Sequence, residues 1–162
     1  MKNFVIKKAK KKDAGTILTF IKKLADYENL SHQVTATEEL LTESLFGPNA
    51  AAECAIGYYN NKPVCFALYF HNFSTFLGKP GLYLEDLFVL PEFRGNGFGK
   101  VMLTYLAKLA VERGCGRFEW AVLDWNEPAL KFYKSLSAES HNEWIIHRVS
   151  GNALYKLAES NI

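Results

Sequence analysis

A glycine-rich stretch carries the most specific chemical signal of this sequence, Arg94-Gly95-Asn96-Gly97-Phe98-Gly99. It follows a strand-like run at residues 82–89 and precedes a run with the apolar spacing of an amphipathic helix. Glycines at a strand-to-helix turn leave successive backbone N–H groups exposed, and the positive end of the helix dipole adds to them. The stretch therefore predicts a site for a phosphate or pyrophosphate group.

Two well-known phosphate loops do not fit this stretch. A Walker A loop needs a glycine where Arg94 stands and a magnesium-binding hydroxyl where Val101 stands. A dinucleotide fingerprint needs G-x-G-x-x-G, whereas these glycines alternate, and Glu119 falls at the start of the next predicted strand and not at its end. An ordinary glycine-rich turn remains the alternative for the stretch taken by itself.

A second motif with chemical potential lies at residues 125–133. Asn126 and Tyr133 are seven residues apart, which is two helical turns, so they share one side of a predicted helix. The tyrosine O–H is a donor suited to protonating a leaving thiolate. Packing of the helix on the sheet is the alternative role; we favour it for Phe132 and Leu136, and a chemical role for Tyr133.

These motifs need a scaffold, and the apolar pattern predicts one. Strands and helices come in an order that first pairs strands as hairpins and then alternates them with helices, which predicts a mixed α/β sheet. A capping box of Thr35 and Glu38 predicts the start of the second helix. Strands are expected at residues 3–8, 52–59, 64–70, 82–89, 117–123 and 144–149, and helices from residue 14, after Thr35, from Phe98 to about Gly114, after Asn126, and from Ser150 to Leu157.

Composition limits the class of protein. With 162 residues, 49% of them hydrophobic, and a formal net charge of +2, the chain suits a single globular domain over residues 1–162. It has no apolar run of transmembrane length and no signal-peptide pattern, so we expect a cytoplasmic protein without a membrane partner. Six of the 19 basic residues fall in the first twelve positions, but a solvated strand end explains them better than a nucleic-acid contact.

The cysteines and histidines predict neither a metal site nor a thiol nucleophile. Cys54, Cys65 and Cys115 are scattered, and they are expected to be buried free thiols without an activating base nearby. The four histidines form no ligand cluster. We therefore expect no metal.

The R-x-x-G-x-G spacing after a hydrophobic strand resembles the coenzyme A pyrophosphate loop of the GNAT superfamily of acyltransferases. Over almost its whole length the chain is similar to the diamine and polyamine (spermidine/spermine) acetyltransferase branch, with its thialysine-acetylating and bacterial relatives. The shared marks are residues 4–6, Leu24-Ala25 with Tyr27-Glu28, residues 82–89, residues 94–99, and Trp125-Asn126-Glu127-Pro128 with Phe132-Tyr133-Lys134. The resemblance implies an α/β fold with a mixed, mostly antiparallel sheet that is splayed at its centre and carries helices on both faces.

The resemblance also implies an activity and a set of roles. An acetyl group would move from acetyl-CoA, the cosubstrate, to a primary amine of a small molecule, in a homodimer whose active site borrows residues from the partner. Glu85 would help to deprotonate the amine through water, and Tyr133 would act as general acid.

Further roles follow from the same resemblance. The cofactor-binding residues would be Phe88, Val89, Arg94, Gly95, Asn96, Gly97, Phe98, Gly99, Lys100, Asn126, Pro128 and Ala129. The amine-binding residues would be Tyr27, Glu28, Glu85, Glu119 and Trp120. For Tyr27 and Glu28 a solvated helix end is the alternative, and for Trp120 a place in the core.

The implied reaction explains why a carboxylate is wanted. An alkyl ammonium with a pKa of about 10 is almost wholly protonated at neutral pH and cannot attack. A carboxylate attracts the cation and relays its proton. Glu85 and Asp86 are neighbours on a strand and are expected to face opposite sides, so only one should line the site; the resemblance selects Glu85.

The chain departs from the polyamine pattern at two acids. Ser74 takes the place of an acid in the loop before the strand at residues 82–89, and Asn142 takes the place of another, with Glu143 beside it. Losing these charges removes attraction for a polycation, so a shorter amine such as a diamine, thialysine or another amino acid side chain is favoured over spermidine. A non-catalytic acyl-CoA-binding sensor and a protein or peptide N-acetyltransferase are the alternatives.

Overall fold

The computed structural model describes residues 2–160. Within them the chain forms two compact units, the first ending at Ala121 and the second beginning at Val122. The first unit holds the whole sheet and the second holds two helices. That residues 1–162 act as a single domain stays a prediction.

The first unit is built on a five-stranded sheet in the order β1-β2-β3-β4-β5. Its strands are β1 Phe4–Lys8, β2 Glu53–Tyr59, β3 Lys62–Ser74, β4 Lys79–Val89 and β5 Arg117–Trp120. β1 to β4 pair antiparallel, and β5 alone pairs parallel, to β4. The connection between the two parallel strands runs through a helix, as parallel pairing requires. The predicted mixed, mostly antiparallel sheet is confirmed.

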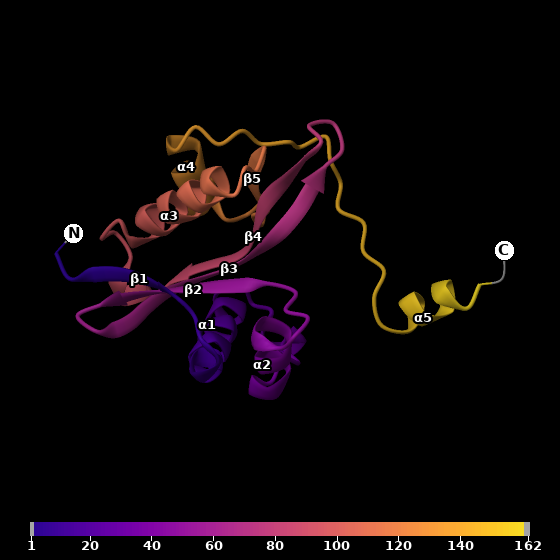
Figure 1. Cartoon of the computed structure of the whole chain (residues 1–162), viewed down its shortest axis with the longest axis horizontal. Helices are drawn as coiled ribbons and strands as arrows, with labels where there is room; N and C mark the ends of the chain where they lie inside the picture. Colours follow the sequence, from indigo (N-terminus) through magenta and orange to yellow (C-terminus); the bar gives the residue numbers. More distant parts are fainter. Residues whose placement is uncertain (1, 161–162) are drawn as a thin grey trace. The chain divides into compact units, whose positions relative to one another are not determined.

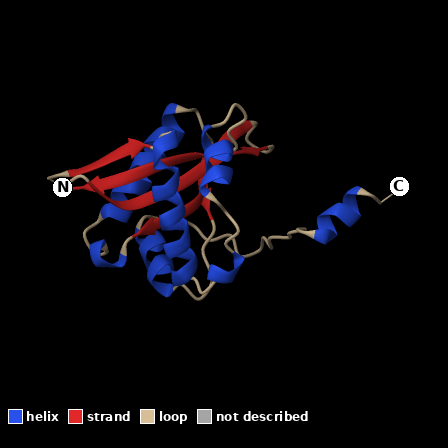
Figure 2. Ribbon diagram, turned by 90° about the horizontal axis from the view of Figure 1, so that it is seen from below, coloured by secondary structure: helices blue, strands red, loops and turns tan. Residues whose placement is uncertain are grey.

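Helices cover both faces of this sheet, as predicted. α1 (Ala14–Tyr27) and α2 (Glu38–Phe46) lie on one face, and α3 (Phe98–Glu112) lies on the other (Figures 1 and 2). Beyond Leu84, β4 extends past the end of β5, and we call this stretch of β4, residues 85–89, the splayed edge. Their pairing ends where Leu84 meets Trp120, although β4 continues to Val89.

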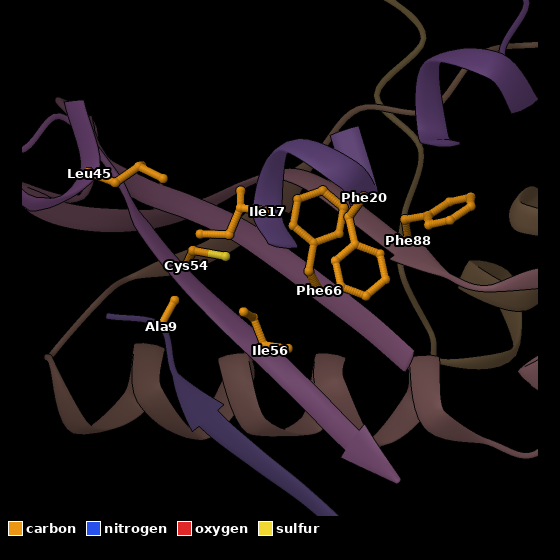
Figure 3. Packing of buried hydrophobic residues seen from close by; sticks show 8 residues of the cluster. All are labelled: Ala9, Ile17, Phe20, Leu45, Cys54, Ile56, Phe66 and Phe88. Atoms are coloured by element: carbon orange, nitrogen blue, oxygen red, sulfur yellow. The ribbon is translucent and has the colours of Figure 1, made fainter. Parts of the chain in front are cut away.

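The core on the α1 and α2 face anchors the strand that leads to the glycine loop. Phe20 of α1 stacks on Phe66 of β3 with ring centroids 5.2 Å apart, and Phe88 of β4 belongs to the same cluster (Figure 3). Phe88 is only 3% exposed. Burying a phenylalanine side chain contributes about 2–3 kcal/mol, so the end of β4 is held firmly just before the loop.

The sequence misplaced the cap of α2. Thr37, and not Thr35, is its N-cap, and the Thr37 hydroxyl accepts a hydrogen bond from the Leu40 N–H at 3.2 Å. A side chain caps a helix by reaching the free N–H groups of the first turn. Thr35 lies too far before the first helical residue, Glu38, to do so.

The expected strand at residues 144–149 is wrong, and β5 is shorter than expected. Residues 144–149 are not in a strand, and the second unit has no strand among its described residues to pair with. A strand forms only where another strand takes its backbone hydrogen bonds, so the apolar pattern of Trp144, Ile145 and Ile146 was not sufficient. β5 ends at Trp120 and not at Leu123.

The second unit contains α4 (Glu127–Ser135) and α5 (Asn152–Ala158). α5 begins after Gly151 and not after Ser150. In the part of the chain that the structure describes, no helix is both long and apolar enough to cross a membrane.

Candidate active site

The glycine loop has the backbone conformation that a phosphate cradle needs. Gly95 and Gly97 have φ angles of 78° and 77°, a backbone region that residues other than glycine rarely adopt. Gly97 is the N-cap of α3, so the N–H groups of the first helical turn have no partner within the helix. A Cβ built on Gly95 would meet no atom within 4 Å, so the space above the loop is open.

The loop is held in place by its own side chains. The Asn96 amide donates to the carbonyl oxygens of Phe93 at 3.1 Å and Arg94 at 3.2 Å. Phe98 points inward, where its ring stacks on Phe4 with centroids 4.4 Å apart. These two predicted cofactor residues therefore fix the loop with their side chains and leave their backbone groups for a ligand. The set fits the pyrophosphate of coenzyme A, because it offers backbone N–H groups at a helix N-terminus.

Arg94 joins the glycine loop to the end of α1. Its guanidinium lies over the Tyr27 ring at 4.5 Å from the centroid and over the Phe88 ring at 5.4 Å. Its Nε donates to the Val89 carbonyl oxygen at 3.1 Å. The structure thus brings together residues that the sequence assigned to the cofactor and to the amine, from three different elements.

The last residues of β4 present backbone groups at the splayed edge. The Leu90 N–H donates to the Val64 carbonyl of β3 at 3.0 Å. Backbone groups of successive strand residues point to opposite sides, so those of Val89 point away from β3. The hydrogen bond from Arg94 to the Val89 carbonyl agrees with this direction. The Val89 N–H is therefore placed where it could donate to an acyl oxygen.

A β-bulge changes the expected arrangement of Glu85 and Asp86. Leu68 pairs with Asp86 and the next residue, Tyr69, pairs with Leu84, so Glu85 is the extra residue of β4. Side chains stop alternating strictly at a bulge. The expectation that the two neighbours face opposite sides of the sheet assumed an unbroken strand, and it stays a prediction.

Asp86 lies in an environment that disfavours its charge. Its pKa is raised to about 6, first by burial and then by the negative charges of Glu85 and Glu28. Burial also raises the pKa of Glu28, the C-cap of α1. Acids that repel one another at a partly buried place are typical of a site that receives a cation.

Tyr83 and Glu119 extend this group along the sheet. The pKa of Tyr83 is raised by burial and then by the charges of Glu85 and Glu119, and Tyr83 is in register with Glu119 of β5. We call Glu28, Glu85, Asp86 and Glu119 the acid cluster. Tyr83 was not among the predicted site residues; its position in the strand-like run was the only signal in the sequence.

Glu119 is held by two residues that the sequence did not single out. The Asn72 amide donates to its Oε2 at 2.7 Å, and Arg117 Nε lies 2.7 Å from the same oxygen. Trp120, the other residue predicted on β5, is in register with Leu84 and contacts the Phe118 ring. Since neighbours on a strand face opposite sides, Glu119 and Trp120 do not line the same side of the sheet.

The Ser74 hydroxyl and the two buried cysteine thiols have structural roles. The Ser74 hydroxyl accepts a hydrogen bond from the Leu77 N–H at 3.3 Å in the turn between β3 and β4. Cys54 and Cys65 are buried free thiols, as expected, and burial raises the pKa of each to about 12. Neither is a thiolate at neutral pH, so neither is a ready nucleophile. Cys115 is only partly buried.

The remaining predicted site residues belong to the second unit. Asn126 is the N-cap of α4, as predicted, and its Oδ1 accepts from the Ala129 N–H at 3.3 Å. Pro128 lies in the first turn of α4, where its missing N–H costs no helical hydrogen bond. Tyr133 lies two turns later, with its ring 5.5 Å from that of Phe132. Their roles toward a ligand stay predictions.

Comparison with known proteins identifies relatives over nearly the whole chain. The acetyltransferase (GNAT) family model matches residues 19–137. The thialysine N-epsilon-acetyltransferase of Sus scrofa is 38% identical, over 98% of this chain and 99% of that protein. An L-ornithine N5-acetyltransferase of Arabidopsis thaliana is 45% identical over 97 residues, which are 60% of this chain and 42% of that protein.

Solved structures share the fold. An integron cassette protein from the mobile metagenome of V. cholerae superimposes with a TM-score of 0.83 and 29% identity, covering 99% of this chain and all of that chain. An aminoglycoside acetyltransferase from an uncultured soil metagenomic sample superimposes with a TM-score of 0.75 at 18% identity, over 92% of this chain and 96% of that one, which shows the fold alone. Among residues 2–160, no three His, Cys, Asp or Glu side chains are grouped as potential metal ligands.

Proposed function

The chain belongs to the GNAT family of acetyltransferases, and we propose that it transfers an acetyl group from acetyl-CoA to the primary amine of a small molecule. Members of this family use acetyl-CoA as cosubstrate. The observation that carries the choice of acceptor is the acid cluster, which lies on β4, β5 and the end of α1 next to the splayed edge. Its negative charges attract a cationic amine.

The glycine loop would hold the pyrophosphate and the edge of β4 the acyl group. The backbone N–H groups from Gly95 to Lys100 supply the donors for the phosphates, with Arg94 adding a positive charge. The Val89 N–H would stabilise the negative charge that develops on the acetyl oxygen. Asn126, Pro128 and Ala129, at the start of α4, would contact the cofactor near its thioester.

The reaction would proceed by direct attack. The acceptor ammonium loses a proton to Glu85 through water, and its nitrogen attacks the acetyl carbonyl carbon. The carbon–sulfur bond breaks, and the departing thiolate takes a proton from the Tyr133 hydroxyl. The high pKa of the Cys54 and Cys65 thiols supports a route without an enzyme nucleophile.

The amine would be a short one. The acid that a polyamine site would use before β4 is replaced by Ser74, whose hydroxyl is committed to the β3–β4 turn and whose side chain is buried. The relatives named for thialysine and L-ornithine support an acceptor of that size. Tyr27 and Glu28 would contact it from the end of α1.

We also propose that the protein acts as a homodimer in the cytoplasm. Several large apolar side chains are exposed, among them Phe76 at 95%, Trp144 at 74% and Ile145 at 77%. Exposed apolar side chains of this size are typical of surfaces that another protein covers. Light scattering coupled to size-exclusion chromatography measures the mass in solution; a mass near twice 18.3 kDa is expected.

The test of the proposed activity is thiol release from acetyl-CoA with a panel of amines. The panel holds diamines, polyamines, thialysine, lysine, ornithine and basic peptides. Selective turnover of one short amine is expected. Turnover of peptides alone would favour a protein acetyltransferase, and coenzyme A binding without any turnover would favour an acyl-CoA sensor.

A further inference from the structure

We propose that Arg117 and Glu119 together recognise the charged head group of an α-amino acid, so that the acceptor is the terminal amine of a lysine- or ornithine-sized amino acid. The α-carboxylate would bind to Arg117 and the α-ammonium to Glu119. This inference rests on the proposed function, and it assigns to a pair of side chains on β5 the choice between amino acids and diamines.

The pair is fixed in place and partly open. Arg117 Nε lies 2.7 Å from Glu119 Oε2, and the two side chains are 37% and 38% exposed. The Asn72 amide donates to the same Glu119 oxygen at 2.7 Å. A second nitrogen of Arg117 lies 3.4 Å from the Phe73 carbonyl oxygen. An arginine has five N–H donors and a carboxylate accepts several hydrogen bonds, so both groups keep capacity for a ligand.

Gly81 makes this arrangement possible. Asn72, Gly81 and Arg117 are in register on three neighbouring strands. A Cβ on Gly81 would collide with the Asn72 amide oxygen and stand 3.0 Å from the Arg117 side chain. Because glycine leaves that space free, both long side chains cross β4, and Asn72 acts as a positioning residue for Glu119.

The pair lies at a suitable distance from Glu85, the proposed base. Glu119 is in register with Tyr83, and Glu85 and Asp86 follow two and three residues later on β4. Strand residues advance by about 3.3 Å each, so the separation is roughly 7–10 Å. A lysine side chain has a four-carbon stem between its amine and its head group, which gives an acceptor of this size the reach to occupy both places.

The charges of the pair select between acceptor classes. An amino acid head group carries a negative carboxylate, which matches the positive Arg117, and a positive ammonium, which matches the negative Glu119. A diamine of the same length lacks the carboxylate and leaves Arg117 without a new partner. A polyamine places a second cation near the guanidinium, which is repulsive, and repulsion against the wrong ligand is an effective source of specificity.

The alternative is that the pair is structural and, through its contacts with Asn72 and Phe73, only fastens β5 to β3. Another arginine–glutamate pair shows what a more buried ion pair looks like. Arg113, the C-cap of α3, pairs with Glu53 of β2, and those side chains are less exposed, at 28% and 24%. A purely structural pair would affect all acceptors equally when it is broken. A recognition pair would affect only acceptors that carry the carboxylate.

The experiment compares matched acceptors, lysine with cadaverine and ornithine with putrescine, in the full-length enzyme with saturating acetyl-CoA. Arg117→Gln is expected to raise the KM of the amino acids about tenfold, the effect of losing a charge-assisted contact. The KM of the diamines should stay within about twofold of the original enzyme. Arg117→Lys should recover part of the loss, because it restores the charge without the guanidinium fork. Lys108→Gln, at an exposed position of α3, removes one positive charge elsewhere and is the matched control.

The outcomes separate this inference from the proposed function. If Arg117→Gln changed the KM of amino acids and diamines equally, or if the wild-type enzyme preferred diamines, the head-group assignment would be overturned and the proposed acetyl transfer would stand. Absence of turnover with every amine would overturn both. Thermal unfolding of each variant shows whether Arg117→Gln has kept the fold.

Discussion

The glycine loop and the acid cluster lie at either side of the same splayed edge, but they present different atoms to a ligand. The loop offers backbone N–H groups, which are fixed once Gly95 and Gly97 adopt their positive φ angles. The acid cluster offers carboxylates from α1, β4 and β5. The first can bind only a group that is common to every reaction of the family, whereas the second can differ from one member to the next.

This difference has an energetic side. The loop needs glycine conformations but no buried charge. The acid cluster is partly buried and crowds like charges, and the pKa of Asp86 rises to about 6, first because of burial and then because of the neighbouring charges. Elsewhere in the same unit Glu53 has two cationic partners, Lys8 and Arg113, and its pKa falls to about 2. Within the acid cluster, Glu119 has a cationic partner in Arg117, whereas Glu28, Glu85 and Asp86 form no salt bridge among residues 2–160. Crowded acids of this kind indicate a site that receives a cation.

The largest expected effect tests whether chemistry requires a residue outside both regions. Tyr133→Phe should lower kcat by roughly 10²- to 10³-fold, because the departing thiolate loses its proton donor. The KM for acetyl-CoA should change little. Steady-state kinetics measure both quantities, and Tyr155→Phe, at an exposed position of α5, is the matched control.

An unchanged kcat in Tyr133→Phe would remove Tyr133 as the acid. The glycine loop and the acid cluster would then have to supply all the chemistry of the reaction.

The acid cluster is tested next by removing its proposed base. Glu85→Gln should lower kcat at neutral pH by about 10²-fold, since the acceptor remains an ammonium. The loss should shrink at pH 9 and above, where the acceptor, with a pKa of about 10, begins to deprotonate by itself. A pH–rate profile shows this recovery; Glu112→Gln, at the exposed end of α3, serves as control. A loss that is the same at every pH would indicate a different role for Glu85.

The sequence predicts the glycine loop better than it predicts the acid cluster. The glycine loop and the Asn126 cap are local patterns, in which neighbouring residues determine the geometry, and both were found from spacing. The bond between Asn72 and Glu119 joins residues 47 positions apart, so no local pattern indicates it. The bulge at Glu85 depends on how β3 and β4 pair, which periodicity within one strand does not reveal.

Residues 144–149 show that a local pattern can also predict an element that does not form. Their apolar pattern is typical of a strand, yet they form none in the structure. A pattern reports what a segment could pair with, and pairing itself depends on a second segment.

The glycine loop can be tested with two glycines that share the same left-handed backbone conformation. Gly95 and Gly114 have φ angles of 78° and 69°, and a Cβ on either would meet nothing within 4 Å. An alanine at each should therefore destabilise the fold by a similar amount, about 1 kcal/mol. Only Gly95→Ala should raise the KM for acetyl-CoA, by about tenfold, because its methyl group enters the space above the loop.

Equal KM values in Gly95→Ala and Gly114→Ala would contradict a backbone cradle at this loop. Thermal unfolding of both variants verifies that the strain is matched.

The smallest expected effect is on stability, and its sign distinguishes the acid cluster from a paired acid. The folded-state pKa of Asp86, about 6, lies above its ordinary value of 3.8, so the folded protein binds the proton more tightly than the unfolded chain does. Stability therefore falls as the pH rises from about 4 to 6 and remains lower above that window.

Asp86→Asn removes this loss, and because Asp86 is partly exposed the gain at pH 8 should be about 1–2 kcal/mol, or a Tm higher by roughly 2–6 °C. At pH 4 the two proteins should unfold at nearly the same temperature. Glu53→Gln should behave in the opposite way: Glu53 contributes stability above pH 4.5 that is lost as the pH falls toward 2, so the variant should be less stable at pH 8. If Asp86→Asn lowered the Tm at pH 8, Asp86 would have a stabilising partner in the folded protein, and the acid cluster would resemble Glu53 more than a site that receives a cation.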